Sequence, residues 1–395
     1  MKPEILVVGG GMIVHDQLLP ALYQLQRLGR IGEISVCAQR AATVAALAAA
    51  PLLREAFPGQ SFRAFPHGCD SGQPHPELYR ELVARMAPRN IVVVAVPDQL
   101  HFEVIMAALE HNQHVCTVKP LVLRHAQALQ IARAAHARGL VVGVEYHKRF
   151  DDRSRMARRA YRAGRFGEFK LGTACLLEKW YYRHSNFQNW MTTENSDAFT
   201  YIGCHYVDLV HFITGLDPAA VSVYGIPERF PNGKEGFLWA DARVIWSNGA
   251  CLNVQNALGF PDAAPGTNTQ SLVMYCSGAE EGALIAHSDQ YRGLQYCYTA
   301  PASYAEPSPD YFQYVEYGGP GLAPVGYGYR SMAHIIETAM RVEAECPDLA
   351  TRQRMLDEID RAGIMATPAN SNFNERVIEA ARESILNGGK LVEIR

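Results

Sequence analysis

The sequence predicts an α/β protein in two parts: a domain of alternating strands and helices, then a second α/β domain with an open, mostly antiparallel sheet. Short apolar runs such as residues 91–96 (IVVVAV) alternate with helical stretches in the first part, as is typical of a parallel sheet covered on both faces. Longer alternating segments separated by Gly, Pro and Asn turns follow residue 149, which favours antiparallel pairing. Because 395 residues exceed the usual size of one domain, we expect domains at residues 1–148 and 149–395.

The first domain repeats one pattern along the chain. Its order of strands and helices is the one that right-handed β-α-β crossovers produce. We expect strands at residues 4–8, 34–38, 91–96, 115–118 and 140–144, and helices around residues 18–25 and at 41–53, 102–109 and 126–138.

The second domain is expected to begin with a helix over residues 153–163, which Gly164 ends. The last helix of the chain is a candidate to pack back on the first domain. We expect strands at residues 237–246, 250–257, 271–276 and 294–299, and late helices at 331–345 and 373–387.

Composition and charge narrow the class of protein. A net charge of −3 gives no electrostatic basis for binding nucleic acid or an anionic membrane. No apolar run approaches the roughly 20 residues of a membrane span, and the first residues enter a strand directly, so we expect no signal peptide. Nine scattered cysteines without a CxxC pair indicate reduced thiols, with neither a disulfide framework nor a metal site. We therefore expect a soluble, cytoplasmic protein.

A glycine-rich turn connects the first strand to the first helix. Gly9 and Gly11 stand where small residues let backbone amides approach a pyrophosphate at a helix N-terminus, and Met12 and Ile13 follow them. Val14 occupies the third glycine position of the G-x-G-x-x-G fingerprint. Within a β-α-β pattern this turn predicts a Rossmann domain that binds a dinucleotide through these residues.

The end of the second strand bears on the choice between NAD and NADP. An acid normally stands there in NAD-preferring proteins and bonds the ribose. This chain has Ala38, Gln39 and Arg40 instead, so Arg40 is a candidate to accept a 2′-phosphate. The sequence favours NADP slightly and leaves both cofactors open.

Two further segments follow buried strands. Val96, Pro97 and His101 come after residues 91–96, and Lys119 with Pro120 comes after the next strand. Ligands of open α/β sheets bind at these carboxyl ends. We expect Val96, Pro97, His101 and Lys119 to contact the cofactor.

Taken together, these motifs resemble the Gfo/Idh/MocA family (glucose-fructose oxidoreductase, inositol dehydrogenase, MocA). The resemblance implies an enzyme that transfers hydride between NAD(P) and a secondary hydroxyl of a sugar, polyol or glycoside. It extends over most of the chain and rests on Gly9 and Gly11, Pro97 with His101, Lys119-Pro120, Tyr146-x-x-Arg149-Phe150, and Gly203-x-His205-x-x-Asp208.

The resemblance also implies catalytic roles and reveals two departures. By the resemblance, Lys119 binds the reacting hydroxyl and His205 receives its proton. Val118 replaces the glutamate that precedes the family lysine, and Tyr201 replaces an aspartate four residues before His205. Tyr201 and His205 lie one helical turn apart and are expected to face one pocket. The aspartate's task, to accept protons or orient the substrate, would then pass to the Tyr201 hydroxyl, which makes Tyr201 a third catalytic candidate, or to other groups. His211 is expected in the core.

The substrate side of the site is expected between residues 178 and 190. Lys179, Trp180 and Trp190, together with Tyr146, are candidates to bind a small-molecule carbohydrate, although the aromatic rings could instead simply cover the sheet. An open sheet with an aromatic face also predicts a homodimer or homotetramer. A polar group in the later strands is expected at the site or a subunit contact: Asn253, Asn256, Asn268, Asp289, Tyr291 and Arg292.

Two other functions remain open at this stage. An NAD-dependent glycosidase oxidises a ring hydroxyl transiently and eliminates an aglycone, and the missing aspartate is compatible with that chemistry. A non-catalytic dinucleotide sensor would keep the fold alone. The presence of both Lys119 and His205 disfavours the sensor.

Overall fold

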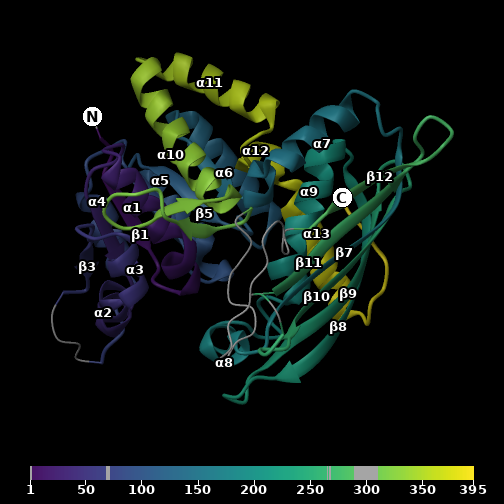
Figure 1. Ribbon diagram of the computed structural model, residues 1–395, viewed down its shortest axis with the longest axis horizontal. Helices are drawn as coiled ribbons and strands as arrows, with labels where there is room; N and C mark the ends of the chain where they lie inside the picture. The colour runs from purple at the N-terminus through teal and green to yellow at the C-terminus, as the bar shows by residue number, and fades with distance from the viewer. Residues whose placement is uncertain (1, 68–71, 265, 267, 289–309) are drawn as a thin grey trace. The chain divides into compact units, whose positions relative to one another are not determined.

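The computed structural model describes residues 2–67, 72–264, 266, 268–288 and 310–395. The chain forms two compact units, each with its own sheet (Figure 1). No helix among these residues combines the length and the apolar character that crossing a bilayer requires. Unit 1 comprises Met1–Val122, Ala126–His147 and Tyr314–Asn370, and unit 2 comprises Leu123–His125, Lys148–Gln313 and Ser371–Arg395.

Unit 1 is built on a six-stranded parallel sheet in the order β3-β2-β1-β4-β5-β6. The order reverses between β1 and β4, and such a switch point is where open α/β sheets bind ligands. The strands are β1 (Ile5–Val8), β2 (Ile34–Cys37), β3 (Arg63–Phe65), β4 (Ile91–Val94), β5 (His114–Val118) and β6 (Val142–Glu145).

Helices on both faces explain the apolar runs of these strands. Every residue of β1 and β4 is buried, as the sequence predicts for a doubly covered sheet. A π-helical turn, η1 (Val14–Leu18), leads into the first helix. The connecting helices are α1 (Leu19–Arg27), α2 (Ala41–Ala49), α3 (Pro51–Ala56), α4 (Leu78–Arg85), α5 (His101–Glu110) and α6 (His125–Arg138).

The segment Tyr314–Asn370 folds with unit 1, whereas the sequence placed it in the second domain. Its helix α10 (Tyr327–Glu345) packs against β5 and β6. A Cβ on Gly143 would lie 2.5 Å from Cγ2 of Ile335, so the missing side chain lets helix and sheet approach. The rest of the segment forms β13 (Gln313–Val315), β14 (Ala323–Val325), α11 (Leu349–Ala362) and α12 (Pro368–Ser371).

A partly buried polar cluster fixes the C-terminal end of α10. The backbone N–H of Val141 donates to Nδ1 of His114 (2.9 Å), so the other ring nitrogen donates to Glu343 (2.8 Å). Both terminal nitrogens of Arg352 also donate to Glu343. Burial by itself raises the pKa of Glu343, but the hydrogen bonds from His114 and Arg352 outweigh it and bring that pKa to about 2.

Unit 2 contains a seven-stranded sheet in the order β12-β11-β7-β10-β9-β8-β15. Strands β7 and β10 pair in parallel, and the other pairs are antiparallel. The open, mostly antiparallel sheet predicted from the sequence is confirmed. The strands are β7 (Phe169–Lys179), β8 (Pro218–Arg229), β9 (Glu235–Trp246), β10 (Cys251–Phe260), β11 (Asn268–Cys276), β12 (Ala283–His287) and β15 (Val392–Glu393).

The two faces of this sheet have different surroundings. Helices α7 (Asp152–Arg162), α9 (Cys204–Thr214) and α13 (Phe373–Leu386) lie on one side of the long strands (Figure 1). On the other face, Leu171 and Tyr275 are register partners and remain about half exposed. Strands β7, β8, β12 and β15 were not predicted, and the predicted strand at 294–299 lies outside the described residues.

Candidate functional site

Gly9 and Gly11, in the turn after β1, have different surroundings. A Cβ on Gly9, whose φ is +120°, would lie 2.0 Å from the carbonyl oxygen of Ala95. Gly9 is therefore required for the turn to pack against the end of β4. A Cβ on Gly11 would meet no atom within 4 Å, so the backbone there is open to a ligand. This division of roles suits a pyrophosphate-binding turn.

The helix that follows the turn begins in an irregular way. Met12 and Ile13 are partly exposed, and Val14 is buried at the start of η1. A π-helical turn accommodates one extra residue within a helix, and such turns are frequent at functional sites. Val14 at the third fingerprint position therefore packs inside unit 1.

The end of β2 presents polar, exposed groups. Gln39 and Arg40 are exposed, and the Gln39 carbonyl accepts a hydrogen bond from the backbone of His75 (2.7 Å). Nη1 of Arg40 donates to the carbonyl of Gly72 (2.8 Å). The guanidinium thus lies over the loop after β3, and the chain has no carboxylate at residues 37–40.

His101 connects the loops that follow β4 and β5. Its ring is fully buried, with Nε2 2.8 Å from the carbonyl oxygen of Val96 and Nδ1 2.8 Å from that of Pro120. Both ring nitrogens therefore face backbone carbonyls. This geometry corrects the expectation that His101 contacts the cofactor: it positions the loops that carry Pro97 and Lys119.

Lys119 directly follows β5, at the carboxyl edge of the parallel sheet. It is partly exposed and joins Pro120 through a cis peptide bond. Because β5 lies between β4 and β6, the residues after these three strands share one edge. Tyr146, expected to bind substrate, follows β6 but is 1% exposed, so its ring belongs to the interior of unit 1.

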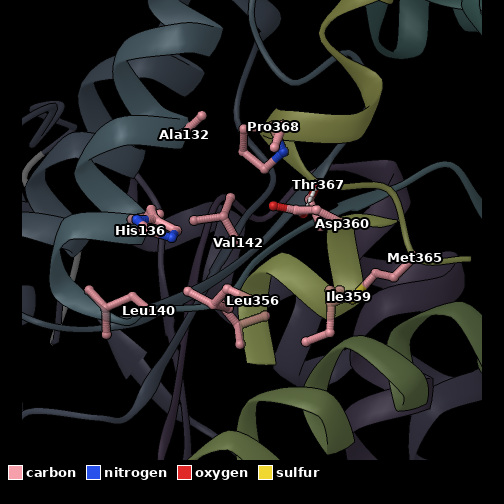
Figure 2. A pocket seen from close by; sticks show the side chains of 13 residues that line it. Ala132, His136, Leu140, Val142, Leu356, Ile359, Asp360, Met365, Thr367 and Pro368 are labelled. Carbon is pink, nitrogen blue, oxygen red and sulfur yellow. Dashed lines mark hydrogen bonds between the residues drawn. The ribbon is translucent and has the colours of Figure 1, made fainter. Parts of the chain in front are cut away.

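A pocket of about 30 Å³ lies beside β6, the outer strand of this sheet. Figure 2 shows its walls, which come from α6, the start of β6, α11 and residues 365–369. Asp360 accepts a hydrogen bond from the Thr367 hydroxyl there (2.5 Å), and burial raises the pKa of Asp360. None of its lining residues belongs to the glycine turn or is Lys119, so this small pocket is separate from the candidate dinucleotide site.

In unit 2, the motif residues His205 and Asp208 both lie on helix α9 but have different surroundings. His205 is buried with 8% exposure near the helix start. Asp208, one turn later, binds Arg149 with two hydrogen bonds of 2.6 and 2.7 Å, and Asn374 of α13 adds a third at 3.1 Å. Asp208 and Arg149 are each 1% exposed, so they form a buried structural pair. The acid of the motif therefore serves packing, and the role of His205 stays a prediction.

Tyr201 lies in a second π-helical turn, η5 (Phe199–Gly203), directly before α9. Its ring packs against Phe187 (centroids 4.9 Å apart) and Trp190 (5.5 Å). The residue at the family's aspartate position is therefore part of an aromatic cluster. His211 stacks on Phe373 and bonds the Leu216 carbonyl, but its side chain is 20% exposed, so it lies at the margin of the core and not inside it.

Two residues expected to bind substrate have other partners. Nζ of Lys179 donates to the carbonyls of Pro261, Asp262 and Ala264 at 2.6 to 3.1 Å. An ammonium group has three N–H donors, so this geometry corrects the expectation: Lys179 holds a turn. Trp180 is 45% exposed and stacks on the guanidinium of Arg183 (3.6 Å).

The polar residues of the later strands do not converge on one described site. Asn256 is buried, and its Oδ1 would lie 2.6 Å from a Cβ on Gly203. Asn253 and Asn268 are partly exposed on β10 and β11. Asp289, Tyr291 and Arg292 lie outside the described residues.

Two protein-family models match the chain. Residues 4–146 match "Oxidoreductase family, NAD-binding Rossmann fold", and residues 154–278 match "GFO/IDH/MocA C-terminal domain". Together they cover more than half of the 395 residues. The chain belongs to the Gfo/Idh/MocA oxidoreductase family. This membership confirms the resemblance and assigns NAD binding to unit 1, since the first model describes an NAD-binding domain.

Curated relatives match over short stretches. An uncharacterized oxidoreductase of Schizosaccharomyces pombe is 31% identical over 24% of this chain and 26% of its own length. D-glucoside 3-dehydrogenase of Escherichia coli is 28% identical over 34% of this chain and 38% of its own length. The matched segments thus span well under half of these relatives.

Solved structures match over the whole chain and show the fold. GenD2 from gentamicin A biosynthesis, in complex with NAD, has a TM-score of 0.69 at 17% identity and covers 100% of this chain and 97% of its own. A scyllo-inositol dehydrogenase from Lactobacillus casei, with NAD(H) and scyllo-inositol, has a TM-score of 0.62 at 15% identity and covers 100% and 99%.

Glu145 and Gln17 did not feature among the sequence candidates. Glu145 ends β6 at the carboxyl edge and is 2% exposed, and Nε2 of Gln17 in η1 donates to its Oε1 at 2.5 Å. The sequence feature that could have pointed to Glu145 is its position as an acid at the end of a buried strand, beside the Tyr-x-x-Arg-Phe motif. A single sequence gives no reason to pair it with a residue 128 positions away.

Proposed function

We propose that this protein is an NAD(P)-dependent dehydrogenase acting on a secondary hydroxyl of a sugar, polyol or glycoside. The glycine turn carries the proposal, because Gly9 is required by packing while Gly11 is open to a ligand at the switch point of the sheet. Similarity to D-glucoside 3-dehydrogenase and to an inositol dehydrogenase supports a carbohydrate substrate.

Lys119 and His205 are the proposed catalytic residues. A bound nicotinamide supplies the hydride acceptor or donor. Lys119, at the end of β5, binds the reacting hydroxyl and stabilises charge on its oxygen. His205 accepts the hydroxyl proton during oxidation and returns it during reduction, since imidazole exchanges protons near neutral pH.

Unit 2 is proposed to bind the substrate and to form subunit contacts. The rings of Tyr201 and Trp190 pack against each other and are partly exposed, and aromatic rings suit the C–H face of a sugar. A phenol in place of a carboxylate keeps one hydrogen-bonding oxygen and loses the charge. The exposed face around Leu171 and Tyr275 supports association of identical chains into a dimer or tetramer.

A substrate screen tests the function directly. Sugars and glycosides are incubated with NAD and NADP while absorbance of the reduced nicotinamide is followed. Lys119→Ala should lower kcat/KM at least 100-fold, roughly the contribution of one proton-transfer group. Aglycone release without net cofactor reduction would instead identify a glycosidase, and dinucleotide binding without any turnover would identify a sensor.

The preference for NADP is a separate part of the proposal and rests on Arg40. Arg40→Ala should raise KM for NADP about 10-fold, the usual value of a charge-assisted phosphate contact, with little change for NAD. Arg54, an exposed arginine of α3, provides the matched control. Strict preference of the wild-type protein for NAD would refute this assignment.

A further inference from the structure

Helix α7 carries a row of arginines on one side. Residues 153–165 contain six arginines and no lysine, in a chain whose net charge is −3. Four of them follow the i, i+3, i+4, i+7 spacing that places side chains on one side of a helix: Arg155, Arg158, Arg159 and Arg162. We call these four residues the arginine face. Like charges at this spacing repel each other and destabilise a helix, so the arrangement carries a cost.

Neutral groups orient the guanidinium groups of the arginine face. Arg155 lies over the Phe150 ring, with Cζ 4.8 Å from the centroid. Arg158 lies over the Phe212 ring of α9 in the same way, at 4.9 Å. Nη2 of Arg162 donates to the Phe212 carbonyl (3.2 Å). Aromatic faces and carbonyl oxygens fix the direction of a guanidinium but cancel little of its charge.

The positive charges of this region act on one another. Burial lowers the pKa of Arg158 to about 10, and three neighbouring arginines add to this shift: Arg162, Arg149 and Arg155. A cation whose pKa is lowered by like charges is being repelled by them. The Asp208 carboxylate already binds Arg149 with two hydrogen bonds of 2.6 and 2.7 Å, so it does not neutralise the arginine face.

Three exposed arginines have no carboxylate partner in the part of the chain that the structure describes: Arg159, Arg162 and Arg165. Arg153, which lies outside the arginine face, does have one, because its Nη2 bonds Asp310 at 3.0 Å. Helix α7 thus neutralises an arginine elsewhere on its surface and leaves exposed charge on and beside the arginine face. Arginines that are oriented without being neutralised are suited to binding an anion.

The arginine face lies apart from the proposed catalytic end of α9. Helix α7 packs against α9 (Figure 1), and the Phe212 ring under Arg158 lies about 10 Å along the helix from His205. A ligand on the arginine face therefore does not need the proposed proton-transfer group. Within unit 2, the face is a site separate from the one proposed for the substrate.

We propose that the arginine face binds a small ligand with two or three linked phosphate groups. Arginine presents a planar fork of N–H donors that matches phosphate oxygens in pairs of hydrogen bonds. Arg155 and Arg162 lie about 10 Å apart along the helix, a length that a short chain of phosphates spans. A long polyanion such as nucleic acid would meet repulsion beyond the face, because the chain as a whole is negatively charged.

Calorimetric titration with tripolyphosphate tests the proposal. The protein is titrated with excess NAD present, so that the glycine turn is occupied. R159Q and R162Q should each raise the Kd about 10-fold, as loss of one charge-assisted phosphate contact does. R229Q removes an equal charge from an exposed position of β8 and should leave the Kd nearly unchanged, because distant exposed charges are screened. Equal Kd values in the wild type and all three variants would overturn the proposal.

Two further titrations separate a phosphate site from a surface that is merely positive. R162K keeps the charge and loses the fork, so it should still weaken binding of tripolyphosphate. A glutamate peptide of the same charge should bind about 10-fold more weakly than tripolyphosphate, because carboxylates offer fewer oxygens per charge to the forks. Wild-type affinity in R162K, or equal affinity for the peptide, would overturn the proposal and point to an acidic protein partner.

The source of the phosphates is distinguished by titrating ADP, UDP and pyrophosphate side by side. Tighter binding of a nucleotide than of pyrophosphate would identify a nucleoside diphosphate, and equal binding an inorganic polyphosphate. Either result supports the site, whereas no binding of any of them would overturn it.

Stability is the control for these variants. Arg162 bonds the Phe212 carbonyl, so R162Q could lose stability as well as affinity, and denaturant unfolding is measured beside each titration. Arg159 is exposed and should fold as the wild type does when replaced, so R159Q decides if R162Q does not fold. No turnover is measured, so the outcome is independent of the roles proposed for Lys119 and His205.

Discussion

The sheets of the two units differ in how many of their faces are covered, and this decides where each can carry function. In unit 1, β1 and β4 are buried on both faces, so groups for a ligand gather at the carboxyl edge. In unit 2, one face packs against helices and the other exposes residues such as Leu171 and Tyr275. A substitution should therefore be costly on either face of the central strands β1 and β4 of the first sheet, but in the second sheet only on the covered side.

The largest effect is expected on the covered side of unit 2. Asp208→Ala leaves Arg149 buried without its carboxylate and should lower the free energy of unfolding by about 3–5 kcal/mol. Asp241→Ala, at an exposed position of β9, should change it by less than about 0.5 kcal/mol. Denaturant unfolding measures both, and equal losses would remove the distinction between the faces.

The carboxyl edge of unit 1 provides the second test. Gly9→Ala should cost about 1–3 kcal/mol, since its Cβ would overlap the Ala95 carbonyl, and should abolish dinucleotide binding. Gly11→Ala has space for its methyl group, so its unfolding should be unchanged while binding weakens. Calorimetric titration with NAD and NADP, beside denaturant unfolding, would separate the two glycines. Equal stabilities would show that Gly9 is not required by packing.

Acid should weaken the attachment of α10 to unit 1. The folded-state pKa of Glu343 is about 2 and its ordinary value is 4.5, so its stabilisation is complete above pH 4.5 and is lost as pH falls toward 2. Burial lowers the pKa of His114, which adds a loss of stability below its ordinary value of 6.5. Because Glu343 is partly solvated, we expect the free energy of unfolding to fall by about 1–2 kcal/mol when this carboxylate is protonated.

Glu343→Gln tests this pH dependence by urea unfolding at pH 7 and pH 4. The variant should be less stable than the wild type at pH 7, and its free energy of unfolding should fall less between pH 7 and pH 4. Glu337→Gln, on the same helix but with a half-exposed ion pair to Arg30, is the control. A wild-type pH slope in Glu343→Gln would exclude this carboxylate as the acid-sensitive group.

The smallest effect on the fold is expected at the exposed face of unit 2. Tyr275→Ser should change the stability of a single chain by less than about 0.5 kcal/mol but should shift the proposed dimer or tetramer toward smaller species in sedimentation. Met274→Ala, one residue away on the covered face, should cost about 2–5 kcal/mol. An unchanged sedimentation profile would refute the proposal that this face forms a subunit contact.

Local patterns account for what the sequence could predict. The run at 91–96 and the turn at Gly9 and Gly11 depend on burial and backbone freedom that adjacent residues reveal, so the Rossmann domain and the glycine turn were foreseen. The family motifs pointed to Lys119 and His205, whose roles stay predictions.

Pairings between distant residues account for what the sequence could not predict. The Ile335 side chain packs over Gly143, and Arg149 donates to Asp208, only after the chain has folded back on itself. For the same reason, Tyr314–Asn370 could not be assigned to unit 1. The π-helical turns η1 and η5 depend on a backbone hydrogen-bond shift that no residue type announces.

Lys179 supplies the turn at residues 261–264 with a positive charge, which many proteins obtain by binding a cation from solution. Three carbonyl oxygens around one positive centre resemble the coordination of a potassium ion, but here the charge is covalently attached to β7. An attached cation cannot be diluted or chelated, so the order of this turn should not depend on the concentration of free cations. Hydrogen exchange at these residues should respond to Lys179→Met and not to potassium.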